Sequence, residues 1–189
     1  MPSCPTWLRE YAAFHRDHRH DPNALMIVYT CTNRMQPGGF GIPGALRAKG
    51  RHSSICFGLG DRFQHIGFML RFAAQHGRVL LIDWQAPEPL EQYLEPSTDE
   101  FDWRPQKMER LSNRTAVQRW MAHNWQLGFR RYSHEWASQR WLRITGNVLA
   151  SAKLNSSALG DSDSFAAPFS CLWRALFKPS RALVGQLAA

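Results

Sequence analysis

The chain lacks the long apolar run that a membrane-spanning helix requires. None of its 189 residues lie in a stretch that approaches the roughly 18 consecutive apolar positions of such a helix. The first residues, MPSCPTWLREYAAFHRDHRH, also lack the apolar segment of a secretory signal peptide. The sequence itself therefore contains no signal that directs the chain to a membrane or into the secretory pathway.

Cysteine and metal-ligand patterns are equally sparse. Four cysteines are too few to define a disulfide scaffold, and no C-x-x-C pair occurs. His15, His18 and His20 lie close together, but no Cys or Glu stands at zinc spacing, so we expect the end of a solvated surface helix and no metal. Asp161-Ser162-Asp163 has the D-x-D spelling of a metal clamp, but it lies in a serine-rich stretch that we predict to be a solvated loop.

Acidic side chains are the minority among the charges. The chain has 15 Asp and Glu against 23 Lys and Arg, a formal net charge of +8 and a sequence pI of about 9.9. This excess favours an anionic partner such as nucleic acid, acidic lipid or a sugar nucleotide. The alternative is that arginine only decorates the surface. With 44% hydrophobic residues the chain is long enough for one core, which would bury roughly 70% of its unfolded surface.

The glycine-rich phosphate motifs are absent in their complete forms, but a related pattern is present. No G-K-[ST] follows a glycine loop, and G-x-G-x-x-G is incomplete. Instead, a glycine turn precedes an amphipathic helix, Gly77 is predicted to end that helix, and Val79–Ile82 reads as a buried strand. The turn consists of Gly58, Leu59, Gly60, Asp61 and Arg62, and the helix has apolar positions at Phe63, Ile66, Phe68, Leu70 and Ala74. This order predicts an α/β fold with a Rossmann-like parallel sheet and flanking helices.

The whole chain is predicted to divide into three parts. Residues 1–23 are predicted to form an N-terminal surface helix, residues 24–145 a Rossmann-like lobe, and residues 146–189 a Ser/Gly-rich linker followed by helices. The individual elements expected are a helix over Thr6–His20, strands over Leu25–Tyr29 and Trp141–Thr145, and helices over Leu90–Leu94, Ser170–Phe177 and Arg181–Leu187.

Several motifs occur in an order that carries a family resemblance. They are Ile27–Cys31, G-L-G-D-R at 58–62, G-R-V-L-L-I-D-W at 77–84, P-E-P-L-E-Q-Y-L at 87–94, D-W-R at 102–104, Trp141–Thr145 and Cys171–Ser180. Together they resemble the N-terminal half of GDP-fucose-dependent fucosyltransferases, the group that contains O-fucosyltransferases and proteins related to α-1,6-fucosyltransferases. The likeness is greatest to the fucosyltransferase-like proteins of algae and protists.

The resemblance implies a GT-B arrangement, in which two Rossmann-like lobes meet at a cleft. It implies GDP-fucose as the donor, with no further cofactor and no metal, and a glycan or protein as the acceptor. It also implies a location in the lumen of the Golgi or the endoplasmic reticulum. In the family an H-x-R-x-G/D segment of the second lobe neutralises the donor's diphosphate. No such segment occurs here, so we expect this chain to be an incomplete lobe that is inactive on its own.

The same resemblance selects candidate site residues. Gly58, Gly60, Asp61 and Arg62 would face the nucleotide sugar across the cleft, because helix N-terminal amides bind phosphate. The alternative is a tight turn in which Asp61 only caps the helix. Asp83 and Trp84 end a strand on the side where α/β sites gather, although packing at the strand end explains them equally well. No general base can be chosen among Asp61, Asp83 and Glu88.

A long basic stretch, predicted as an insertion at residues 32–55, separates the first strand from the glycine turn. Two partial copies of that turn occur, at 38–41 and 57–60, and removing residues 42–60 would leave a single family-like turn. Three explanations of this stretch remain open: a retained intron, an insertion, or a genuine basic loop beside the site. Cys31 and Cys56 flank this stretch, and we predict that they lie near each other and form a disulfide if the chain is lumenal.

A nucleic-acid-binding module is the alternative function. Basic and aromatic side chains alternate in the second half of the chain, as stacking and phosphate contacts require. They are Arg119, Trp120, Trp125, Arg130, Arg131, Tyr132, Arg140, Trp141 and Arg143. The simpler explanation is a pair of amphipathic helices with tryptophan facing inward and arginine outward. No named nucleic-acid motif is present, which argues against this function.

Overall fold

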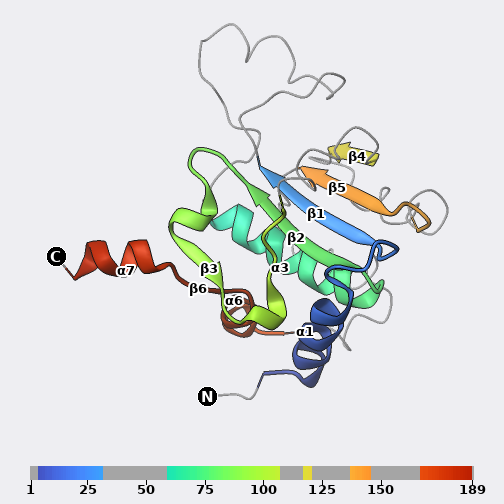
Figure 1. Cartoon of the computed structure of the whole chain (residues 1–189), viewed down its shortest axis with the longest axis horizontal. Coiled ribbons are helices and arrows are strands. Elements are labelled where there is room, and N and C mark those ends of the chain that lie inside the picture. The colour runs from blue at the N-terminus through green and yellow to red at the C-terminus, as the bar shows by residue number, and fades with distance from the viewer. Residues whose placement is uncertain (1–3, 32–58, 107–116, 121–136, 146–166, 189) are drawn as a thin grey trace, which may run out of the picture.

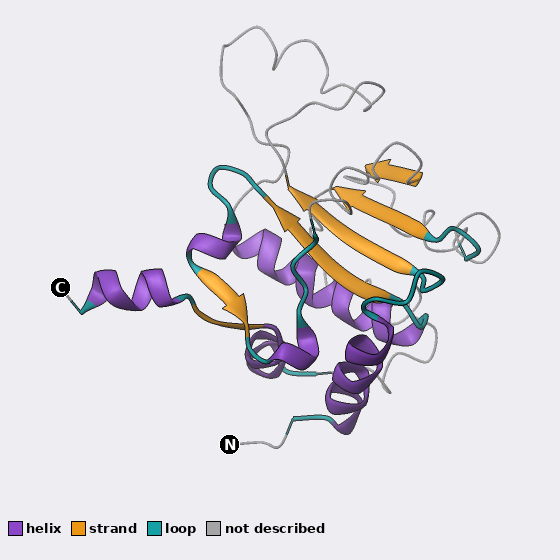
Figure 2. Ribbon diagram, in the orientation of Figure 1, coloured by secondary structure: helices purple, strands orange, loops and turns teal. Residues whose placement is uncertain are grey.

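A four-stranded parallel sheet forms the centre of the protein. This computed structural model describes residues 4–31, 59–106, 117–120, 137–145 and 167–188, with only the backbone at 117–120 and 145. Figures 1 and 2 show the sheet, whose strand order is β2-β1-β5-β4. The strands are β1 (Met26–Cys31), β2 (Val79–Trp84), β4 (Val117–Trp120) and β5 (Trp141–Thr145). The predicted Rossmann-like α/β class is confirmed.

Helices and a small second sheet complete the fold. The helices are α1 (Thr6–His18), α3 (Leu59–Gln75), α6 (Phe169–Leu176) and α7 (Arg181–Leu187), with short 3-10 turns at Leu90–Gln92 and Asp99–Phe101. Strands β3 (Leu94–Pro96) and β6 (Phe177–Pro179) pair antiparallel. In Figure 1, α7 projects from the body towards the C-terminus, and none of its residues is buried.

The strands and the main helix follow from their sequences. All six residues of β1 and of β2 are buried, as expected for parallel strands with near-continuous apolar runs. Helix α3 buries Ile66, Phe68 and Leu70, while Phe63 and Ala74 pack against the core from partly buried positions. Gly77 ends this helix with φ of +55°, a conformation that favours glycine, so the predicted C-cap is confirmed.

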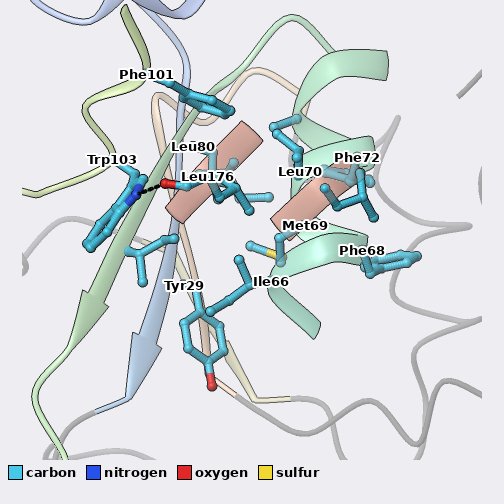
Figure 3. Close-up of a cluster of buried hydrophobic side chains, with 14 of the residues drawn as sticks. Tyr29, Ile66, Phe68, Met69, Leu70, Phe72, Leu80, Phe101, Trp103 and Leu176 are labelled. Carbon is cyan, nitrogen blue, oxygen red and sulfur yellow. Dashed lines mark hydrogen bonds between the residues drawn. The ribbon is translucent and has the colours of Figure 1, made fainter. Parts of the chain in front are cut away.

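The main core lies between the sheet and helices α1, α3 and α6. Figure 3 shows part of it, where Leu70 and Phe72 of α3 meet Leu80 of β2 and Leu176 of α6. The indole of Trp103 is fully buried there and its Nε1 donates to the carbonyl of Leu176 at 2.7 Å. A second, smaller cluster lies on the opposite face of the sheet and contains Ala24, Met26, Val28, Val79 and Leu81.

Helix α1 covers the outer edge of β2. The hydroxyl of Tyr11 accepts from the Leu80 amide at 3.0 Å and donates to the Arg78 carbonyl at 2.8 Å. His15 Nε2 donates to the Leu80 carbonyl at 3.0 Å, and burial lowers the pKa of His15 to about 4, so its ring is neutral at neutral pH. The prediction of a solvated helix end was therefore wrong at His15, because an edge strand needs partners for its outward-facing groups.

Four local predictions need correction. Leu59–Arg62 form the first turn of α3 rather than a glycine turn, and Gly58 lies outside the described residues. Only Leu90–Gln92 are helical in the predicted helix over 90–94, because Leu94 pairs with Pro179 in the small sheet. Phe177 leaves α6 for the same sheet, where it pairs with Pro96. Val117–Trp120 is a strand beside β5, which excludes a helix there, and residues 121–136 lie outside the described ranges.

A disulfide that the sequence did not reveal joins the start of the chain to α6. Cys4 and Cys171 are bonded, with their Cα atoms 5.5 Å apart across 167 residues of sequence. The predicted partner of Cys31, Cys56, lies outside the described residues, so that pairing stays a prediction, as does the insertion at 32–55. The linker over 146–166 also falls outside the described ranges.

The Leu81→Ala substitution tests the second core cluster. Leu81 is fully buried, so removing its side chain leaves a cavity, and we expect the free energy of unfolding to fall by about 2–5 kcal/mol. Urea denaturation of both proteins measures this loss. Leu187→Ala on the exposed end of α7 is the control and should change stability little. A Leu81→Ala protein as stable as the parent would contradict the assignment of this core.

The double substitution of Cys4 and Cys171 by serine tests the cross-link. The bond closes a very long loop, so its loss should lower the free energy of unfolding by about 2–5 kcal/mol. Thermal unfolding without reductant measures the effect, and the single Cys4→Ser and Cys171→Ser proteins should be similarly weakened. A double variant with unchanged stability would show that the bond does not form.

Candidate functional site

Three polar side chains meet at the carboxyl edge of the sheet. Thr30 of β1 is paired in register with Asp83 of β2, and Arg143 of β5 reaches both of them. One nitrogen of Arg143, Nη1, donates to Thr30 Oγ1 at 2.9 Å and to Asp83 Oδ2 at 3.1 Å. Parallel strands end at the same edge, which is why residues so far apart in sequence come together.

The Arg143–Asp83 ion pair is almost completely buried. The side chains are 2% and 5% exposed. Burial lowers the pKa of Arg143, while the neighbouring Asp83 raises it and supplies the opposite charge that a buried guanidinium requires. Asp83, a predicted cleft residue, is thus engaged in a pair that ties three strands together.

Breaking this pair should be costly. Arg143→Met leaves the carboxylate of Asp83 without this partner in a buried position, and we expect a loss of about 3–5 kcal/mol in the free energy of unfolding. Asp83→Asn should also destabilise, while the Arg143→Met/Asp83→Asn double variant should lose less than the sum of the two single losses. Chemical denaturation of all four proteins gives the coupling. Strictly additive losses would show that the two groups do not interact.

A second group of residues lies on the other face of β2. Trp84 points to the side of α3, opposite to Asp83, because side chains alternate along a strand. The guanidinium of Arg62 lies 4.7 Å from the centre of the Trp84 ring, and its Nη1 donates to the Ala86 carbonyl at 2.6 Å. The structure therefore brings the predicted residues Arg62 and Trp84 together but separates Asp83 from both.

Tyr29 and His65 join Arg62, and the sequence did not single them out. The two rings lie 5.2 Å apart, between β1 and α3. Burial lowers the pKa of His65 to about 3, so the imidazole is neutral, and burial raises the pKa of Tyr29 although the nearby charge of Arg62 opposes that rise. The helical spacing of Arg62 and His65 is the one signal that could have indicated a shared face.

The remaining candidates lie in the first turn of α3. Gly60 is exposed and Asp61 is half-buried. A β-carbon at Gly60 would meet nothing within 4 Å, so the fold does not require glycine there. The amide groups of this turn point away from the helix, as an anion site needs, although the carboxylate of Asp61 already occupies the favourable end of the helix dipole.

A pocket that sequence reasoning missed lies between α3 and α6. Its volume is about 570 Å³. It is lined by Leu59, Gly60, Phe63, Gln64, Gly67, Phe68, Arg71, Phe169, Leu172 and Trp173. One end of the pocket is formed by Leu59 and Gly60, which belong to the same first turn of α3 as Arg62. No sequence pattern predicts it, because α6 lies about a hundred residues further along the chain.

The other functions considered from the sequence find little support in the described residues. In these parts of the chain no cluster of three or more His, Cys, Asp or Glu could hold a metal. Among the helices that can be described, none is long and apolar enough to cross a membrane. Arg143, a candidate phosphate contact of the nucleic-acid hypothesis, is buried in its ion pair, while residues 125–132 lie outside the described ranges.

The parallel sheet and its flanking helices define a Rossmann-like α/β fold. Neither a family model nor a curated protein matches the chain. Among solved structures, the chain is similar to the fucosyltransferase FUT1 of Arabidopsis thaliana, determined as a mutant in complex with GDP. The TM-score is 0.57 at 12% sequence identity, over 99% of this chain and 48% of that one. The chain thus spans about half the length of this distant structural relative, and the likeness is one of fold.

Proposed function

We propose that this chain is one lobe of a GDP-fucose-dependent glycosyltransferase of the GT-B type, which transfers fucose to a glycan or protein acceptor. The observation that carries the proposal is the fold likeness to a GDP-bound fucosyltransferase over 99% of the chain. The order of the family-like motifs from Ile27 to Ser180 also supports it.

The donor would lie at the carboxyl edge of the sheet, beside the first turn of α3. The amides of Gly60 and Asp61 and the charge of Arg62 are the groups suited to a diphosphate. Trp84 fixes the guanidinium of Arg62 from one side, so its position is set before a ligand arrives. Gly58 would belong to the same site, and the role of Asp83 would be to hold the edge in shape through Arg143.

In a transfer site that lies between two lobes, each lobe forms one wall of the cleft, and both walls are needed. This chain spans about half of its structural relative, and it would supply one wall. A single wall can neither exclude water nor hold the diphosphate and the acceptor in line. We therefore propose that residues 1–189 bind GDP weakly and do not transfer fucose without a second lobe.

The disulfide between Cys4 and Cys171 is what we would expect of a protein in an oxidising compartment. The bond between Cys4 and Cys171 is of a kind that persists in secreted and lumenal proteins and is rare in the cytosol. This supports the lumen of the Golgi or the endoplasmic reticulum as the location. The resemblance also implies that no metal assists the reaction.

Calorimetric titration with GDP tests the donor site. Arg62→Gln removes the charge while keeping a polar side chain, and we expect GDP affinity to fall by about tenfold or more. Arg181→Gln, on the exposed helix α7, is the matched control and should bind GDP as the parent does. Parent protein that does not bind GDP, or an Arg62→Gln protein that binds it equally well, would contradict this site.

A transfer assay tests the single-lobe proposal separately. Purified residues 1–189 are incubated with GDP-fucose and a panel of glycan and peptide acceptors. We expect no turnover above background, since one wall of the cleft is missing. Clear turnover by this chain alone would overturn the single-lobe proposal while leaving the donor site intact.

A further inference from the structure

We propose that the pocket between α3 and α6 binds a sugar ring that carries a carboxylate. Four observations lead to this ligand: the size of the pocket, its aromatic walls, an arginine in its lining without an acidic partner among the described residues, and its position at the N-terminal turn of α3. The identification of this sugar as part of the acceptor rests on the proposed function, whereas the binding site itself does not.

The pocket is held in shape by a close contact between two helices. At Gly67, a β-carbon would lie only 3.2 Å from Leu172 Cδ1, so glycine lets α6 approach α3 closely. The disulfide from Cys171 to Cys4 also ties the same helix to the start of the chain. A volume of about 570 Å³ lies within the usual range of small-molecule sites, which is roughly 300–1,000 Å³.

Aromatic rings form much of the wall. Phe63 and Trp173 meet edge to face with centroids 4.7 Å apart, and Phe169 lies 6.1 Å from Trp173 while remaining 50% exposed. The faces of such rings are electron-rich, and the C–H groups on one side of a pyranose pack well against them. Gln64, an exposed residue in the same lining, offers an amide for hydroxyl groups. A sugar ring satisfies both features.

Arg71 supplies the preference for an anion. Its Nη2 donates to the Ala167 carbonyl at 3.1 Å, and its buried Nε has no hydrogen-bond partner. Within the described part of the chain, no carboxylate forms an ion pair with this guanidinium. Burial lowers the pKa of Arg71, which shows that the charge is costly where it stands. A carboxylate in the pocket would offset that cost.

The pocket is well placed for an acceptor. Leu59 and Gly60 line it and belong to the same first turn of α3 that carries Arg62. A ligand seated against Trp173 would therefore extend towards the end of α3 at which the proposed donor site begins. A neutral sugar would satisfy the aromatic wall but would leave the charge of Arg71 uncompensated, which is why the proposal specifies an acidic one.

Titration with two matched sugars tests the proposal. Methyl β-glucuronide and methyl β-glucoside differ only in the carboxylate, and their binding to residues 1–189 is followed by ligand-observed NMR. We expect the glucuronide to bind about tenfold more tightly or better, and added salt to reduce this preference. Arg71→Gln should abolish the preference, Arg71→Lys should retain part of it, and Arg181→Gln should leave it unchanged.

Several results would overturn the inference. They are equal affinity for the two sugars, no binding of either, or an Arg71→Gln protein that keeps the preference. Because Arg71→Lys keeps the charge, a loss of preference in Arg71→Gln alone is not explained by misfolding. GDP titration of the same preparation separates this inference from the proposed function. GDP binding without glucuronide binding refutes only the pocket, and the reverse result refutes only the donor site.

Discussion

The outer edge of β2 is the constraint on which the rest of the described fold depends. This strand ends the sheet, so the backbone groups that face away from β1 have no strand to pair with. Tyr11 and His15 of α1 satisfy the amide and carbonyl of Leu80, and the carbonyl of Trp103 accepts from the Ile82 amide at 2.8 Å. Since Trp103 in turn bonds to Leu176, the edge also determines where α6 lies.

The two faces of the same strand serve different purposes. On one face, Asp83 joins Arg143 and Thr30 in a charged contact that locks β1, β2 and β5 at their carboxyl ends. On the other face, Trp84 supports Arg62 at the start of α3. The end of β2 thus stabilises the sheet through Asp83, while the next residue, Trp84, packs against the buried guanidinium of Arg62. The structural task and the proposed binding task therefore fall on neighbouring residues that face opposite sides of the strand.

The sequence correctly predicted several elements whose structure is decided locally. The apolar run Val79–Ile82, the spacing of Ile66, Phe68 and Leu70, and the glycine at 77 each have a local physical cause, and the structure confirms all three. Arg62 was selected through the family resemblance and Trp84 from its place at a strand end; the structure brings the two into contact, and their role in binding stays a prediction. The burial of His15, the ion pair of Arg143 and the bond between Cys4 and Cys171 were missed because each joins segments distant in sequence. Periodicity carries no information about such pairs, and the pocket between α3 and α6 was missed for the same reason.

The link between Cys4 and Cys171 makes almost the whole chain a covalent ring. The ring spans a sequence separation of 167 residues. A single backbone cut anywhere within it leaves the two fragments attached, because the disulfide still joins them. A nicked molecule would thus keep α1 on the edge of β2 and α6 on α3 without having to reassemble from two free pieces. Residues 172–188, which include most of α6, β6 and α7, lie beyond the ring, as do the residues before Cys4, and only a cut in these parts could release a fragment.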